Sequence, residues 1–369
     1  MPEVSPWNSG TDMSPDEIAS LNAACERHWH KKNAVGSSSP PTSLVPIETP
    51  VDGATHMSGI THSLNGSYTL FPATPLEQNF RHRSWSARRA KIEAVIAQQT
   101  SRNLRLERWQ ACGGQAQVYW HIPDRRHVVF SLRCHDRFCW PCAKARSNLV
   151  AKNLQKALGK QQPRFVTLTL RANTDPLTKQ IDRLYLAYRT LRYDPWWKKK
   201  VTAAASFCEI TLNPETRLWH PHLHPLVCGD FLPQSVLARK WLGVTGDSPI
   251  AHIKMVPDTE TVCRYVCKYA SKPMDDSVFD DQERLAELVY SLKGRRLCLA
   301  TGTMAKAGLL DKPAPICMTD LKHLGSLTEV HAQAALGQAW ATAALSSCQK
   351  GCQWEDLAPF DELEHAGLS

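Results

Sequence analysis

Residues 205–228 read ASFCEITLNPETRLWHPHLHPLVC, and this stretch decides the expected fold. Its first part, Ala205 to Leu212, has the composition of a strand, and a short Asn213-Pro-Glu turn leads into a second apolar run. Upstream, residues 164–170 (RFVTLTL) alternate as a strand does, and the apolar residues of 175–192 have broadly helical spacing. A strand, a helix and then two strands joined by a short turn predict an α+β fold with an antiparallel sheet and flanking helices.

Three histidines, His220, His222 and His224, alternate along the second apolar run. On an extended strand such side chains share one face, where imidazoles carry a large desolvation cost unless they form hydrogen bonds or bind a metal. Glu209 lies on the preceding strand, which the turn brings alongside. Two imidazoles and one carboxylate could therefore form an open metal site. The helical HExxH motif of zinc proteases, which use the same donor types, is absent from the sequence.

A second group of candidate ligands is formed by four cysteines, Cys112, Cys134, Cys139 and Cys142. Four thiolates can close a tetrahedron around Zn²⁺ at about 2.3 Å, and such a site stabilises a segment too short to form its own core. We therefore expect a structural zinc. A redox CxxC is the alternative, although residues 140–141 (WP) lie outside the strand-to-helix context that activates a thiol. Three nearby histidines could replace Cys112 as a ligand: His121, His127 and His135.

The positive charge of the chain lies in one block. The net charge is +9 over 369 residues, yet residues 102–200 contain 21 Lys and Arg against 6 Asp and Glu. Aromatic residues run through this block, as in residues 193–200 (YDPWWKKK), a combination that suits a groove that neutralises phosphates and stacks bases. A solvated basic face without a partner is the alternative. We expect a nucleic acid partner.

The remaining composition points to a cytoplasmic protein with no membrane partner. No apolar run approaches the roughly 18 residues of a membrane span, and the first residues (MPEVSPWNSGTDMSPDE) lack the regions of a signal peptide. Thirteen cysteines, several within apolar segments, fit a reducing compartment. We divide the chain into a flexible low-complexity region (1–75), a basic helix with the cysteine-rich segment (76–150), the domain with the histidines (151–310), and a helical region with an acidic tail (311–369). In the last region the alanine-rich stretch past residue 325, VHAQAALGQAWATAALSSC, predicts one helix.

Two tyrosines form the last candidate group, in residues 263–272 (CRYVCKYASK). Tyr265 and Tyr269 are four residues apart and would share one face of a helix, accompanied by Lys268 and Lys272. Such a helix can simply pack its tyrosines and expose its lysines. A phenol with a pKa near 10 becomes a useful nucleophile only beside a cation or a metal, which the histidine strand could hold.

Three motifs of the chain, in their order, resemble those of the rolling-circle replication initiators of the HUH endonuclease superfamily. They are FVTLTLR, then HPHLHPLV with Glu209 ahead of it, then YVCKYASK, and the resemblance covers about residues 110–300. The cysteine segment resembles the region before the first motif in plasmid-encoded members. The resemblance implies an HUH-type sheet with His222 and His224 as metal ligands and Glu209 as the third, holding Mg²⁺ or Mn²⁺. His220 would then not be a ligand.

The resemblance also implies a reaction. Tyr269 would be the nucleophile that forms a 5′-phosphotyrosine link on single-stranded or extruded origin DNA, and Lys272 would position or stabilise charge. The free 3′-OH would prime synthesis by a host DNA polymerase. Because the sequence contains no GxxxxGK[ST] loop, a separate host helicase would open the duplex.

One departure from many single-tyrosine initiators is Tyr265, which stands where they have a glutamate. The pair resembles the phage gene A proteins and the two-tyrosine transposases, so Tyr265 could perform a second cleavage or the rejoining. Two alternatives to the plasmid initiator stay open: a two-tyrosine HUH transposase, and a non-catalytic zinc-dependent DNA-binding repressor.

Overall fold

The computed structural model describes residues 70–98, 104–256, 263, 276–314, 316–349 and 353–356. These residues belong to two compact units, each described by itself. The histidine unit contains described residues 158–256 and 297–306. The cysteine unit contains the described residues of 70–157, 260–296 and 307–356.

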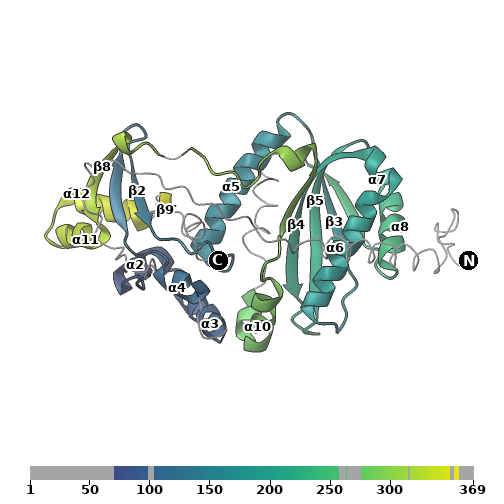
Figure 1. The fold of residues 1–369 in the computed structure, drawn as a ribbon, viewed down its shortest axis with the longest axis horizontal. Helices are drawn as coiled ribbons and strands as arrows, with labels where there is room; N and C mark the ends of the chain where they lie inside the picture. The colour runs from purple at the N-terminus through teal and green to yellow at the C-terminus, as the bar shows by residue number, and fades with distance from the viewer. Residues whose placement is uncertain are drawn as a thin grey trace, which may run out of the picture. The chain divides into compact units, whose positions relative to one another are not determined.

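The histidine unit is built on an antiparallel sheet of five strands in the order β6-β3-β5-β4-β7 (Figure 1). The strands are β3 (Arg164–Thr169), β4 (Val201–Leu212), β5 (Trp219–Gly229), β6 (Ala251–Met255) and β7 (Cys298–Gly302). β4 and β5 form a long hairpin because Asn213 closes its turn, where its side-chain Oδ1 accepts hydrogen bonds from the backbone N–H groups of Glu215 and Thr216, each at 2.9 Å. The predicted strand-turn-strand unit is therefore present.

Helices cover one face of this sheet. α6 (Leu177–Tyr193) buries five apolar side chains at helical spacing: Leu177, Ile181, Leu184, Tyr188 and Leu191. Its Tyr188 hydroxyl hydrogen-bonds Ser206 of β4, and Trp241 of α8 (Gln234–Thr245) donates from Nε1 to the carbonyl of Thr169 at 2.8 Å. The short helix α7 (Pro195–Lys200) leads into β4, and a 3-10 turn, η2 (Thr303–Lys306), follows β7. Because Ser206 and Glu209 are three positions apart on one strand, the face covered by α6 is opposite to that of Glu209.

The cysteine unit contains a second sheet, in the order β8-β1-β2-β9. β1 (Gln117–His121) pairs antiparallel with β2 (Arg126–Ser131) and β8 (Leu321–Ser326), whereas β9 (Gln353–Asp356) pairs parallel with β2. The helices are α2 (Pro75–His82), α3 (Ser86–Ala97), α4 (Leu104–Ala111), α5 (Trp140–Leu158), α10 (Gln282–Ser291), α11 (Leu327–Ala335) and α12 (Ala339–Gln349), with 3-10 turns η1 (Asp276–Asp280) and η3 (Met318–Asp320). Val118 and Val129 of the sheet pack in one core with apolar residues of α11 and α12, including Val330 and Ala344.

The predicted fold class, α+β with antiparallel sheets and flanking helices, is confirmed. One local prediction is wrong: the alanine-rich stretch after residue 325 is not one helix but two, α11 and α12. Gly337 between them has a left-handed backbone (φ +82°), which stops the first helix. The segment boundaries predicted at residues 75, 150 and 310 stay a prediction, and nearly all of residues 1–75 lie outside the described residues. None of the helices in the described part of the chain is long and apolar enough to cross a membrane.

Candidate functional site: a histidine face and a cysteine cluster

The three predicted histidines lie on one face of β5, as the alternation predicts. The rings of His220 and His222 are 4.2 Å apart between centroids, and those of His222 and His224 are 6.0 Å apart and stacked. In the β4–β5 register Glu209 is directly opposite His222, so its carboxylate shares this face. Its Oε2 lies 2.9 Å from Nε2 of His224. The structure thus brings His222, His224 and Glu209 to one side of the sheet.

Three threonines complete this face. Thr169 Oγ1 lies 3.1 Å from Nδ1 of His222, and Thr167 Oγ1 lies 3.3 Å from Nδ1 of His224. Thr211 of β4 donates its hydroxyl to the carbonyl of His220 at 3.1 Å and approaches Nε2 of His222 at 3.4 Å. Sequence reasoning assigned these threonines no role, although the alternation in FVTLTL is a signal that two of them share a face.

Burial keeps the central imidazole neutral. The pKa of His222 falls from 6.5 to about 3, mainly because burial penalises the charged ring, and also because His220 and His224 are close. Burial also lowers the pKa of His220, and a backbone hydrogen bond involving Leu170 partly opposes this shift. Imidazole nitrogen and carboxylate oxygen are both ligand types for divalent ions, the first more typical of zinc and the second of Mg²⁺ and Mn²⁺. The ligand types of His222, His224 and Glu209 are therefore compatible with a metal, but among the described residues only the four cysteines have three or more ligand atoms within 4.8 Å of one another.

Two tyrosines and a lysine predicted to act with this face, Tyr265, Tyr269 and Lys272, lie outside the described residues. Their roles stay a prediction. The strand β6, which pairs with β3 at the edge of the same sheet, ends at Met255, ten residues before Tyr265 in the sequence.

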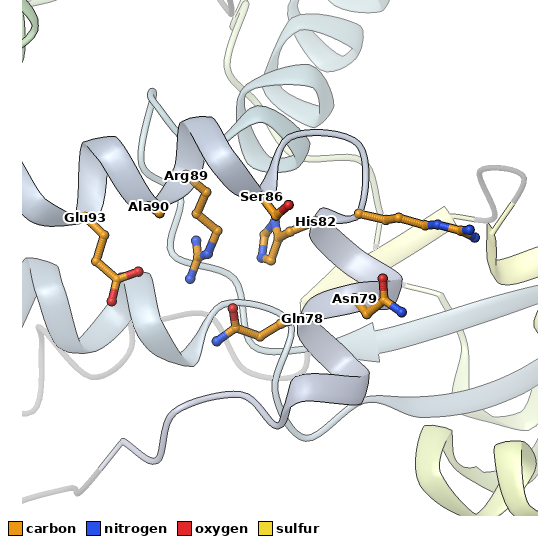
Figure 2. A pocket seen from close by; sticks show the side chains of 8 residues that line it. Gln78, Asn79, His82, Ser86, Arg89, Ala90 and Glu93 are labelled. Atoms are coloured by element: carbon orange, nitrogen blue, oxygen red, sulfur yellow. The ribbon is translucent and has the colours of Figure 1, made fainter. Parts of the chain in front are cut away.

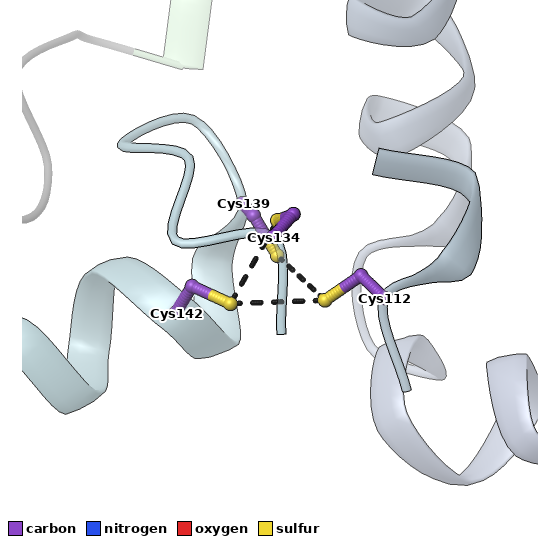
Figure 3. A group of neighbouring side chains, drawn as sticks. All are labelled: Cys112, Cys134, Cys139 and Cys142. Carbon is purple, nitrogen blue, oxygen red and sulfur yellow. Dashed lines mark hydrogen bonds between the residues drawn. The ribbon is translucent and has the colours of Figure 1, made fainter. Parts of the chain in front are cut away.

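The four predicted cysteines come together in the cysteine unit (Figure 3). All four are buried, and their sulfur atoms lie within 4.8 Å of one another. Cys112 Sγ is 3.8 Å from that of Cys139 and 3.7 Å from that of Cys142, and Cys134 Sγ is 3.8 Å from that of Cys142. A regular tetrahedron with sulfur atoms 2.3 Å from its centre has edges of about 3.8 Å. The cluster can therefore hold a metal such as zinc, with Cys112 rather than a histidine as the fourth ligand.

The thiol pKa values within the cluster differ. Hydrogen bonds from the neighbouring thiols lower the pKa of Cys112 well below its ordinary value, and the pKa of Cys142 is lowered to about 7, whereas burial raises the pKa values of Cys134 and Cys139 well above the ordinary value. The partly buried Arg81 approaches Cys142 Sγ with Nη2 at 3.9 Å. Its positive charge partly offsets the negative charge of a four-thiolate site. Sequence reasoning missed Arg81, because it lies 31 residues before the first cysteine.

A cavity of about 300 Å³ lies between α2 and α3 of the same unit (Figure 2). It is lined by polar and charged residues, among them Arg83, Arg89 and Glu93. His82, also in its wall, donates from Nε2 to the carbonyl of Cys112 at 3.0 Å, while Arg89 donates to the carbonyl of Trp109. The helices of the cavity thus also support the loop that holds Cys112.

Comparison with known proteins gives one match. The family described as replication protein (Rep_1) matches residues 126–335, more than half of the chain. This range includes the histidine strand and three of the four cysteines. No curated protein and no solved structure matches the chain.

Proposed function

Because the chain belongs to the replication protein family, we propose that it starts rolling-circle replication of a plasmid by nicking and rejoining one DNA strand. The observation that supports this proposal best is the histidine face, on which His222, His224 and Glu209 lie together in the middle of an antiparallel sheet. A replication protein of this family binds origin DNA, and the basic block predicted from the sequence supplies the charge for it.

The histidine face would hold a divalent ion, Mg²⁺ or Mn²⁺, through the imidazoles of His222 and His224 and the carboxylate of Glu209. When bound, such an ion polarises a phosphate oxygen of the scissile bond. The chain contributes a neutral imidazole at His222, whose pKa of about 3 keeps protons from competing for its nitrogen near pH 7. The donors are also held by strands rather than loops, which limits their movement.

Tyr269 would attack the scissile phosphorus through its phenolic oxygen. The new bond is a 5′-phosphotyrosine ester, the bond that breaks is that between phosphorus and the 3′-oxygen, and the 3′-oxygen leaves as a hydroxyl after it takes up a proton. Because the ester retains the energy of the phosphodiester, a later hydroxyl can rejoin the strand. Lys272 would stabilise the charge on the phosphate, and Tyr265 would provide a second attacking hydroxyl.

The cysteine cluster would hold a structural zinc, because a site closed by four thiolates leaves no position open for a substrate. A host helicase and a host DNA polymerase would then extend the free 3′-OH. No phosphate-binding GxxxxGK[ST] loop occurs in the sequence to drive strand separation by the chain itself.

A covalent-adduct assay tests this function. The purified protein is incubated with Mn²⁺ and 3′-labelled single-stranded oligonucleotides that tile the DNA around its own gene, and adducts are resolved on a denaturing gel. We expect one oligonucleotide to shift to the size of a protein–DNA adduct. Tyr269→Phe should lose nearly all of this adduct while it retains DNA binding. A wild-type protein that binds the DNA but forms no adduct would support the repressor instead.

The histidines provide the matched variants for the same assay. His222→Ala and His224→Ala should abolish the adduct but largely retain DNA binding, because binding depends mainly on phosphate contacts. His220→Ala should have a smaller effect, since Glu209 contacts His224 and is opposite His222 in the strand register. If His220 proved as necessary as His222, the assignment of the ligand pair would be wrong.

A further inference from the structure

Two threonines of β3 contact the two histidines in the same way. Thr169 Oγ1 lies 3.1 Å from Nδ1 of His222, and Thr167 Oγ1 lies 3.3 Å from Nδ1 of His224. We propose that Thr167 and Thr169 are positioning residues, which hold the Nδ1 atoms of both imidazoles so that Nε2 of each ring is the nitrogen that a metal would bind, in place of its present contact with Glu209 or Thr211. This inference rests on the proposed metal site, and it assigns a role to the FVTLTL strand.

The register of the sheet makes this contact specific. Thr169 is the direct cross-strand partner of His222 in the β3–β5 ladder, and Leu168 is that of Leu223. Thr167 is two positions before Thr169 and therefore on the same face. One strand thus presents a hydroxyl to each imidazole at the same nitrogen. Thr169 is only 5% exposed, so bulk water cannot readily replace its hydroxyl.

The chemistry of the hydroxyl explains why threonine is suitable here. A neutral imidazole has one N–H and one bare nitrogen, and only the bare nitrogen can bind a metal. In the structure the carboxylate of Glu209 lies 2.9 Å from Nε2 of His224, and because a carboxylate oxygen accepts, this contact needs a hydrogen on Nε2. The Thr167 hydroxyl at Nδ1 can donate or accept, as the tautomer requires. If Nε2 binds a metal, the proton must move to Nδ1. The threonine hydroxyl can then rotate and accept it, because a hydroxyl both donates and accepts.

In His222, too, metal binding at Nε2 requires that the hydrogen of the neutral ring be on Nδ1. Its Nε2 approaches Thr211 Oγ1 at 3.4 Å, a long hydrogen bond that a metal could readily replace, whereas the Thr169 contact at Nδ1 is shorter. Phe165, which stacks on His224 with ring centroids 5.4 Å apart, restricts the tilt of that ring. The contacts from β3 therefore orient both rings, and the threonine hydroxyls can bond Nδ1 in either tautomer.

Valine substitutions separate this role from simple strand packing. Valine has the shape and the strand preference of threonine but no hydroxyl. We expect Thr167→Val and Thr169→Val each to weaken Mn²⁺ binding by about 10- to 100-fold, which is typical of the loss of a hydrogen bond to a ligating histidine. Thr167→Ser and Thr169→Ser should restore the affinity. Thr202→Val, on β4 and bonded to the carbonyl of Cys228, is the matched control and should bind as the wild type does.

The affinity is measured on the full-length, zinc-loaded protein by calorimetry and by the electron paramagnetic resonance signal of free Mn²⁺. If His222→Ala and His224→Ala bind Mn²⁺ like the wild type, the proposed metal site is wrong. If those variants lose binding but both valine variants retain it, the metal site stands and the role of the threonines is refuted.

A second measurement uses only the wild-type protein, so its result does not depend on whether a variant folds. In the wild-type protein labelled with ¹⁵N-histidine and loaded with Mg²⁺, His222 and His224 should both carry a hydrogen on Nδ1 and none on Nε2, which binds the metal. Protonation at Nε2 with Mg²⁺ bound would overturn the inference.

Discussion

Acidification should destabilise the histidine unit through His222. Its pKa is lowered from 6.5 to about 3, a difference of about 3.5 that corresponds to about 5 kcal/mol against protonation in the folded state. Between pH 6.5 and 3 the unfolded chain binds a proton that the folded chain does not. The free energy of unfolding should therefore fall as the pH falls, by about 1.4 kcal/mol per pH unit from this residue. Above pH 6.5 and below pH 3 the contribution of His222 should not change.

The assay compares urea unfolding of wild type and His222→Gln between pH 7 and pH 4, in buffer without Mg²⁺ or Mn²⁺. The free energy of unfolding of His222→Gln should fall less per pH unit than that of the wild type. Plotted against pH, the two free energies should therefore converge or cross on acidification. Parallel curves for wild type and His222→Gln, or a His222 resonance that titrates near pH 6.5 in ¹³C-histidine spectra, would refute the reasoning.

Three other outcomes follow from the same structure. Cys139→Ser should lower zinc content, solubility and melting temperature together. Cys208→Ser, at a buried cysteine outside the cluster, should leave the zinc content unchanged. A full complement of zinc in Cys139→Ser would exclude the cluster as the zinc site. Glu209→Gln should weaken Mn²⁺ binding and adduct formation while it leaves DNA affinity nearly unchanged, and equal adduct in variant and wild type would remove Glu209 from the ligand set. Tyr265→Phe should still form the first adduct but fail to release closed single-stranded circles from a substrate with two origins; normal circles would leave Tyr265 with a packing role only.

The histidine face could be predicted from the sequence because it depends on residues close together in the chain. Alternation along His220 to His224 fixes a shared face, and the short turn at Asn213 brings Glu209 alongside. The cysteine cluster was likewise predictable, because the ligand types limit its geometry even across the 21 residues between Cys112 and Cys134.

Contacts between strands that are distant in the sequence could not be predicted from it. The hydroxyl of Thr169 meets His222 across 53 residues, and which strand is the neighbour of β5 depends on the order of the whole sheet. The break at Gly337 was missed for another reason: alanine-rich periodicity continues on both sides of it, and only the positive φ distinguishes a helix end from a tolerated glycine.

The order of the second sheet has a consequence for synthesis of the chain on the ribosome. β1 and β2 emerge early, but β8, which pairs with β1, begins only at Leu321, and β9, which pairs with β2, begins only at Gln353, both after the five strands of the histidine unit. At about 5–20 residues per second, roughly 10–40 s of translation separate the end of β2 from β8. During this interval the outer edges of both β1 and β2 are unpaired, while β3 to β7 of the histidine unit become complete. The histidine unit can thus fold first, and a nascent chain that stalls before Leu321 would expose two unpaired strand edges to other chains.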